Sequence, residues 1–194
     1  MYYLKTAPTT EPVSLAEAKA QCRVDITEDD GYIDQLIATA RRMCEEWASP
    51  RLAMIAQTWL YVADEFPASD TITLAVFPLQ SVTSIKYTDT DGVTTTLAST
   101  DYLIDTYSQP GRVRLKTNAS WPSVTLQELN GFVIEFVAGY GNTATAVPEH
   151  FRHAVKMLVE HWYESREPVA SAGMMKEIPF AVNALMASEW TKVG

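Results

Sequence analysis

The spacing of hydrophobic residues changes twice along the chain and divides it into three segments. Up to about residue 57, and again from about residue 142, apolar residues recur every three or four positions, as on one face of a helix. Between these segments the chain consists of short runs rich in β-branched and aromatic residues, separated by turn sequences. We therefore predict an α+β fold, a small helical bundle with an inserted, mostly antiparallel β domain.

Two helices are predicted before the β segment. The first, over about 14–23, starts with a capping box, because Ser14 is followed by Glu17 three residues later. The second, over 29–48, starts among acidic residues, which the helix dipole favours, and stops before Pro50. Its apolar face is expected to consist of Tyr32, Ile33, Leu36, Ile37, Ala40, Met43, Cys44 and Trp47, with Asp34, Arg41, Arg42, Glu45 and Glu46 on the polar side.

About seven strands are predicted over 58–140. Asp91 and Gly92 separate two of the strand-like runs, which indicates a hairpin turn in which Gly92 adopts positive φ. The predicted strand sequences are TWLYVAD, TITLAVF, SVTSIKYTD, VTTTLAS, YLIDTY, RVRLK and FVIEFVAGY.

Two further helices are predicted after the β segment, over 149–165 and 179–189. Residues 169–178, VASAGMMKEI, have small side chains and no helical periodicity, so we expect this linker to be mobile. The expected domains are a discontinuous helical domain, 1–57 with 142–194, and an inserted β domain, 58–141.

Composition excludes several classes of protein. The chain has 194 residues, is 47% hydrophobic and carries a net charge of −9, so it can form a substantial core but is a poor candidate for DNA binding through phosphate neutralisation. No apolar run approaches the roughly 20 residues of a membrane span, so we expect a soluble protein without membrane contact. Cys22 and Cys44 both fall on apolar helix faces, which favours core packing over a redox role.

All three histidines lie in the helix predicted over 149–165, and their spacing decides whether the helix could hold a metal ion or a catalytic site. His150 and His153 are three residues apart, but His161 lies about 12 Å further along the helix, too far to share an ion with them. A closed zinc site would need ligands from elsewhere, and the chain has no other histidine. We therefore expect a solvated or interfacial helix face, and no catalytic, cofactor-binding or metal-ligating residues.

Two features of the β segment leave a choice of interpretation. Arg112, Arg114 and Lys116 alternate in sequence, so they share one face of a strand. They form either a basic stripe that meets an acidic partner or DNA, or a solvated strand face whose charges discourage edge pairing. We favour the solvated face. The aromatic residues of this segment are expected to pack in the core. If they instead formed a binding surface, the alternative function would be a ligand- or carbohydrate-binding β module flanked by helices. The aromatic residues are Trp59, Tyr61, Phe66, Phe77, Tyr87, Trp121, Phe132, Phe136 and Tyr140.

The order of the sequence segments over about 12–187 resembles the head–tail connector proteins of tailed bacteriophages and related gene transfer agents, also called adaptor or head-completion proteins. The pieces that carry the resemblance are PVSLAEAKAQCRVD, TEDDGYIDQLIATAR, AQTW, FPLQSVTSIKYTDTDG, DYLID, Trp121-Pro122, VIEFVAGYG, VPEHFRHAVKMLVEHWYESRE and IPFAVNALM. No single piece is specific, and the resemblance rests on their shared order.

The resemblance implies a structural virion protein and no enzyme. Such a protein would form a ring, expected to be a dodecamer, between the capsid portal protein and the stopper or tail-side neck protein. The ring would extend the DNA channel, and DNA would pass through it without specific binding. The expected location is the virion neck, after assembly in the bacterial cytoplasm.

The C-terminal segment is the predicted docking site for the portal protein. Val182, Leu185 and Met186 form an apolar stripe at helical spacing, and Trp190 follows it. A helix this short needs a partner surface. That surface is either a groove on the portal or the chain's own helical bundle, and the sequence leaves both open.

Overall fold

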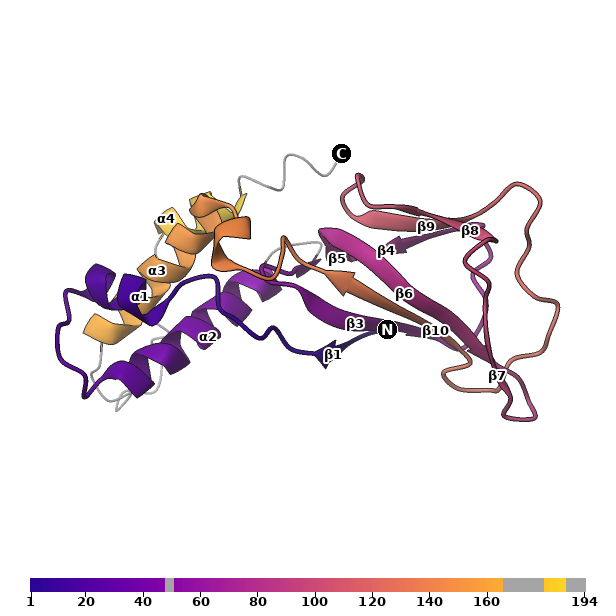
Figure 1. Ribbon diagram of the computed structural model, residues 1–194, viewed down its shortest axis with the longest axis horizontal. Coiled ribbons are helices and arrows are strands. Elements are labelled where there is room, and N and C mark those ends of the chain that lie inside the picture. Colours follow the sequence, from indigo (N-terminus) through magenta and orange to yellow (C-terminus); the bar gives the residue numbers. More distant parts are fainter. Residues whose placement is uncertain (48–50, 166–179, 188–194) are drawn as a thin grey trace. The chain divides into compact units, whose positions relative to one another are not determined.

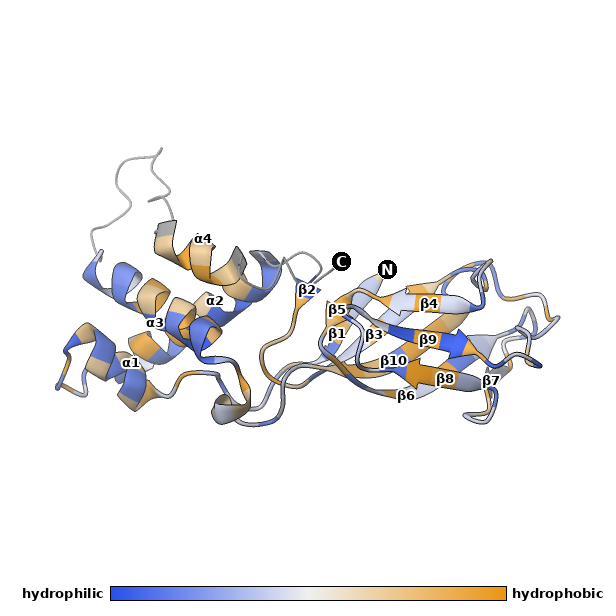
Figure 2. Cartoon of the chain, turned by 90° about the horizontal axis from the view of Figure 1, so that it is seen from above, coloured by the Kyte–Doolittle hydropathy of each residue, from blue (hydrophilic) through white to orange (hydrophobic). Residues whose placement is uncertain are grey.

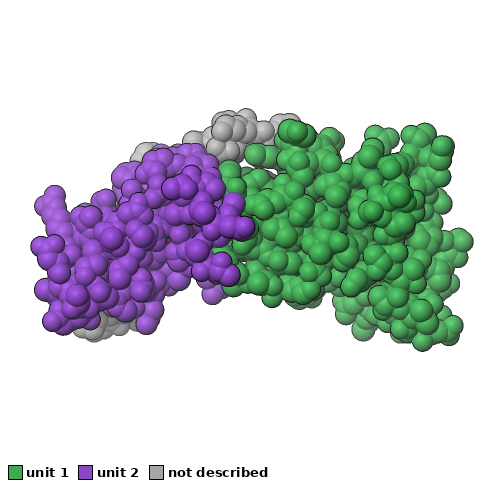
Figure 3. Space-filling model, in the orientation of Figure 1, with its two compact units in different colours: residues 1–8, 56–140 green, residues 9–55, 141–194 purple. Residues whose placement is uncertain are grey.

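The computed structural model describes residues 1–47, 51–165 and 180–187 (Figure 1). The chain forms two compact units (Figure 3). Residues 1–8 and 56–140 form the first, which we call the β unit, and residues 9–55 and 141–194 form the second, the helical unit. The predicted α+β class is confirmed, because helices and antiparallel sheets both contribute to the fold.

The β unit contains two layers of antiparallel strands (Figures 1 and 2). The larger sheet has the order β1-β3-β10-β6-β7, and the smaller sheet has the order β4-β9-β8. The strands of the unit are β1 Tyr2–Thr6, β3 Gln57–Ala63, β4 Thr71–Leu74, β5 Val76–Phe77, β6 Leu79–Thr88, β7 Thr94–Thr96, β8 Tyr102–Asp105, β9 Gly111–Leu115 and β10 Phe132–Ala138.

The core of the β unit follows from strand alternation. In β10, every second residue from Phe132 to Ala138 is fully buried, while the residues between are partly exposed. β9 alternates in the same way, with Gly111, Val113 and Leu115 buried. Gly111 leaves no room for a side chain, since a Cβ atom there would lie 2.4 Å from the Cβ of Leu79 in the other sheet.

Strand register fixes two local features of the β unit. β3 and β10 pair without interruption from Gln57 opposite Ala138 to Ala63 opposite Phe132. β6 and β7 form the predicted hairpin, and Gly92 in its turn has a φ of +79°. The prediction for this turn is therefore confirmed.

The first strand differs from the sequence prediction. Residues 1–8 were placed with the helical domain, but β1 pairs with β3 and belongs to the β unit. The sequence YYLKT has no clear apolar–polar alternation, so a strand here depends on a partner distant in the chain.

The helical unit has α3 in contact with each of the other three helices. α1 begins at Ser14 with the predicted capping box, in which both reciprocal hydrogen bonds are present. α2 buries Ile33, Ile37, Ala40 and Cys44, as the periodicity predicts, but Tyr32, which was expected on the same apolar face, is exposed. The elements of this unit are α1 Leu15–Cys22, α2 Asp30–Trp47, β2 Arg51–Leu52, the 3₁₀ turn η1 Ala144–Ala146, α3 Glu149–Glu164 and α4 Phe180–Ala187.

The contact at Gly111 gives a test of sheet packing. We expect Gly111→Ala to lower the free energy of unfolding by about 1–3 kcal/mol, because the added methyl group overpacks the space next to Leu79. Gly31→Ala is the matched control, since nothing lies within 4 Å of a Cβ there and alanine favours helix. Urea unfolding of both variants measures the difference. Equal stabilities would contradict the packing described here.

Candidate functional site

The histidine-bearing helix has the core face that its sequence predicts. α3 buries Phe151, Ala154, Val155, Leu158 and Val159. His153 is exposed, as expected for a solvated face. His150 and His161 differ from that expectation, because both residues are half-buried and their Nε2 atoms are covered from solvent. The described residues contain no group of three or more histidine, cysteine or acidic side chains arranged to hold a metal ion.

Neither cysteine has the surroundings of a reactive thiolate. Cys44 is fully buried, and burial raises its pKa to about 12. Cys22 is half-buried, and its pKa is raised by burial and by the charges of Glu160 and Glu164. Both thiols are therefore protonated at neutral pH, in agreement with the core-packing interpretation.

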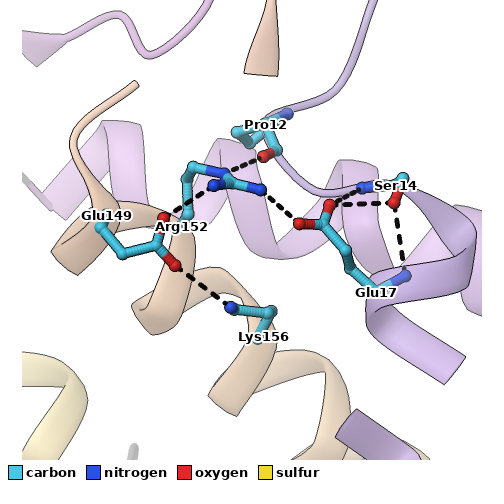
Figure 4. A network of polar contacts seen from close by, with 6 residues as sticks. All are labelled: Pro12, Ser14, Glu17, Glu149, Arg152 and Lys156. Atoms are coloured by element: carbon cyan, nitrogen blue, oxygen red, sulfur yellow. Dashed lines mark hydrogen bonds and ion pairs between the residues drawn. The ribbon is translucent and has the colours of Figure 1, made fainter. Parts of the chain in front are cut away.

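Arg152 on α3 is the centre of the polar network drawn in Figure 4. Its Nε donates to the carbonyl oxygen of Pro12 at 2.9 Å, and its Nη1 donates to the Glu149 carboxylate at 2.7 Å. Nη2 forms an ion pair with Glu17 of α1. Lys156 joins through Glu149 at 3.4 Å. One guanidinium group thus connects α3 to α1 and to the segment before it.

The capping box of α1 is part of the same network. The Ser14 backbone N–H and hydroxyl both donate to one carboxylate oxygen of Glu17 at 2.9 Å, and Arg152 contacts the other oxygen. The Ser14 backbone hydrogen bond, with smaller contributions from the Ser14 hydroxyl and Arg152, lowers the pKa of Glu17 and outweighs the opposing effect of burial. Glu17 therefore stays ionised at neutral pH, as the ion pair requires.

A second polar network lies in the C-terminal half of α2. Arg41 donates to Glu11 and to Glu45, each at 2.7 Å, and Glu45 accepts the backbone N–H of Met54 at 2.8 Å. Arg41 and Glu45 were assigned to the polar side of this helix, but both are buried. Burial lowers the pKa of Arg41, but the hydrogen bonds and charges of the two glutamates raise the pKa by more than burial lowers it. The net shift is therefore upward. Helix periodicity alone could not distinguish such a buried pair from exposed charges.

Arg112 and Arg114 lie on the exposed side of β9, and Lys116 follows directly after the strand and is also exposed. β9 is the central strand of its sheet, so the proposed role against edge pairing is wrong (Figure 2). Arg112 pairs with Asp105 of β8 at 2.6 Å. Hydrogen bonds from Ser108 and Arg112 hold the pKa of Asp105 well below its usual range.

The nine aromatic residues considered for a sugar platform lie largely inside the β unit. Each of the nine residues considered is buried or half-buried. Phe66, Tyr87, Trp121 and Phe132 form one cluster, in which Phe66 stacks on Trp121 with ring centroids 5.8 Å apart. This arrangement agrees with the predicted core role.

Three of the four predicted docking residues, Val182, Leu185 and Met186, lie in the described part of the chain. Val182 and Met186 on α4 are 0% and 3% exposed, and α4 contacts α3. Leu185 is half-buried. Trp190 and the linker 169–178 lie outside the described residues. The burial of Val182 and Met186 favours the alternative in which this stripe packs on the chain's own bundle.

Comparisons with known proteins agree on one family and one fold. Residues 12–174 match the sequence model of the head completion protein family. No curated protein matches the chain significantly. None of the described helices is long and apolar enough to cross a membrane.

Three solved structures share the fold over 97% of this chain. One is from the virion of a native gene transfer agent particle, with a TM-score of 0.77, 24% identity and 94% of that chain covered. The second is from the neck of an empty gene transfer agent particle, computed with C6 symmetry, with a TM-score of 0.75, 23% identity and 94% of that chain covered. The third is from the neck of a native particle, computed with C12 symmetry, with a TM-score of 0.67, 24% identity and 93% of that chain covered.

The Arg152 network gives a testable prediction for the stability of the helical unit. We expect Arg152→Met to lower the free energy of unfolding by about 1–3 kcal/mol, because it leaves the Pro12 carbonyl and the Glu17 carboxylate without this donor. Arg42→Met is the matched control, since Arg42 is exposed and lies 3.9 Å from Glu46. Thermal unfolding compares the two variants. A loss no greater than the control's would show that the network contributes little.

Proposed function

Because the chain belongs to the head completion protein family, we propose that it forms the ring adaptor between the capsid portal and the stopper or tail of a phage-like particle. The observation that carries this proposal is the family match over residues 12–174, which includes parts of both units. The chain is a structural protein and not an enzyme. In this role, the ring extends the channel through which DNA leaves the capsid.

The proposed location is the neck of the virion, after assembly in the bacterial cytoplasm. The fold supports this location, because two of the similar structures come from necks of gene transfer agent particles. Those necks were computed with C6 and C12 symmetry, and both symmetries are compatible with a ring of twelve copies. We therefore propose a dodecamer.

The proposed ring provides a path for DNA without binding it. Each copy carries a net charge of −9, so a ring concentrates negative charge instead of the lysine and arginine that would neutralise phosphates. Such a wall repels DNA and lets it slide. Specific DNA contacts are not part of the proposal.

Within this proposal, the helical unit is the connector domain and the β unit is its insertion. The portal contact is assigned to the end of the chain, where Trp190 follows α4. Since Val182 and Met186 are buried, they support this contact by holding α4 in place and do not themselves enter the portal.

Loss of the chain should stop head completion. In a strain that encodes this protein and produces particles, we expect deletion of its gene to give DNA-filled heads without tails, and the wild-type gene to restore tailed particles. Electron microscopy and mass spectrometry of purified particles measure both effects. Tailed particles that lack the protein would rule out the proposed role.

The two parts of the predicted docking site can be separated by mutation. We expect Trp190→Ala to leave the melting temperature unchanged and to reduce incorporation into portal-containing particles. Met186→Ala should instead lower stability by about 2 kcal/mol or more, because it opens a cavity under α4. Truncation after Glu177 should combine the two effects. Normal incorporation of the Trp190 variant would show that Trp190 is not needed for the portal contact, and the proposed docking role of the end of the chain would be wrong.

A further inference from the structure

The smaller sheet of the β unit has an outer face with exposed apolar and basic side chains. Antiparallel register places Leu103 of β8 beside Arg114 of β9, and Asp105 beside Arg112. Leu103 is 56% exposed. Neither Arg114 nor Lys116 has an ion pair among the described residues. We call Leu103, Tyr107, Arg112, Arg114 and Lys116 the sheet-face patch.

Tyr107 extends this patch at the turn between β8 and β9. Its side chain is 97% exposed, the highest value among the large apolar residues described. The turn itself is held firmly, because Asp105 accepts the backbone N–H groups of Tyr107 and Ser108, the Ser108 hydroxyl and the Arg112 guanidinium. A tyrosine presented on a preorganised turn loses little entropy on binding, and tyrosine is enriched at interface hot spots.

The helical unit has a surface of complementary character. Its described residues include only two exposed large apolar side chains, Ile26 at 54% and Tyr32 at 40%. Both lie in the stretch 23–34, which has one basic and five acidic residues, giving 1 − 5 = −4. Asp25, Glu28 and Asp34 are exposed there, with no ion pair among the described residues. We call Asp25, Ile26, Glu28 and Tyr32 the acidic patch.

We propose that the sheet-face patch of one copy binds the acidic patch of a second copy of this chain. The sheet face has three basic residues against Asp101 and Asp105, giving 3 − 2 = +1, so it is a basic surface on an acidic chain. Each patch offers exposed apolar groups among charges of one prevailing sign, and the two signs are opposite. Burial of the apolar groups supplies attraction, and the charges select the partner.

The charges also limit the symmetry of the contact. The acidic patch does not pair with itself, because such a contact would oppose like charges. The contact joins two different surfaces, and when successive copies repeat it head to tail it closes into a ring if the rotation allows. The inference rests on the ring adaptor proposed above and specifies which surfaces meet in it.

Charge reversal tests the pairing directly. We expect Arg114→Glu with Lys116→Glu, or Asp25→Lys with Glu28→Lys, to weaken self-association of the full chain by about a hundredfold, because each change opposes like charges. An equimolar mixture of the two variants should associate again, since each then offers the surface that the other needs. Sedimentation velocity at increasing protein concentration and low ionic strength measures all of these samples. Higher salt should weaken the wild-type contact.

Matched controls separate the contact from general effects of charge and hydrophobicity. Lys86→Glu and Asp91→Lys change exposed charges elsewhere in the β unit and should leave association unchanged. Tyr107→Ala should weaken association about tenfold or more, whereas Leu129→Ala, at another exposed apolar residue, should not. Circular dichroism confirms that each variant is folded.

The possible outcomes decide the proposal. Loss in each single variant with recovery in the mixture supports it. Reversed variants that associate like the wild type, a mixture that does not recover, or a wild type that stays monomeric under all these conditions overturns it. The neck role is judged separately, because a chain that is incorporated into particles in spite of a failed pairing test keeps that role and loses only this interface.

Discussion

The helical unit depends on bringing together two parts of the chain that the β unit separates in sequence. α3 must return to α1 and α2 after more than eighty intervening residues. Its apolar face supplies most of the attraction, but apolar contacts alone do not fix the position of a helix along its partner. Arg152 adds that information, because its three donors contact groups at fixed positions up to 140 residues away in the chain. The contacts of α1 and α4 with α3 both require this return.

The parts of the fold that sequence analysis predicted have local causes. The capping box at Ser14, the apolar faces of α2 and α3 and the turn at Gly92 are each determined by residues a few positions apart. The parts that it missed depend on distant partners. β1 is a strand because β3 lies beside it, β9 is central because β4 and β8 flank it, and Arg41 is buried because Glu11 reaches it from another segment.

The same distinction applies to the candidate site. Many metal sites have recognisable ligand spacings, and the histidines of this chain do not have one. A docking surface has no such signature, because an apolar stripe looks the same whether it faces a partner or the chain's own core. Val182 and Met186 illustrate this, since their spacing fits both uses and only their burial against the chain favours one. Assembly proteins are therefore recognised more readily by the order of their segments than by single residues.

The uninterrupted pairing of β3 with β10 has a consequence for how such chains can diverge. Because Gln57 lies opposite Ala138, the segment 57–138 leaves and rejoins the rest of the chain at neighbouring backbone positions, about 5 Å apart for paired strands. A segment with adjacent ends can be shortened, enlarged or exchanged while the flanking helices keep the same distance to bridge. Such an exchange must keep β3, because β1 at the start of the chain pairs with it.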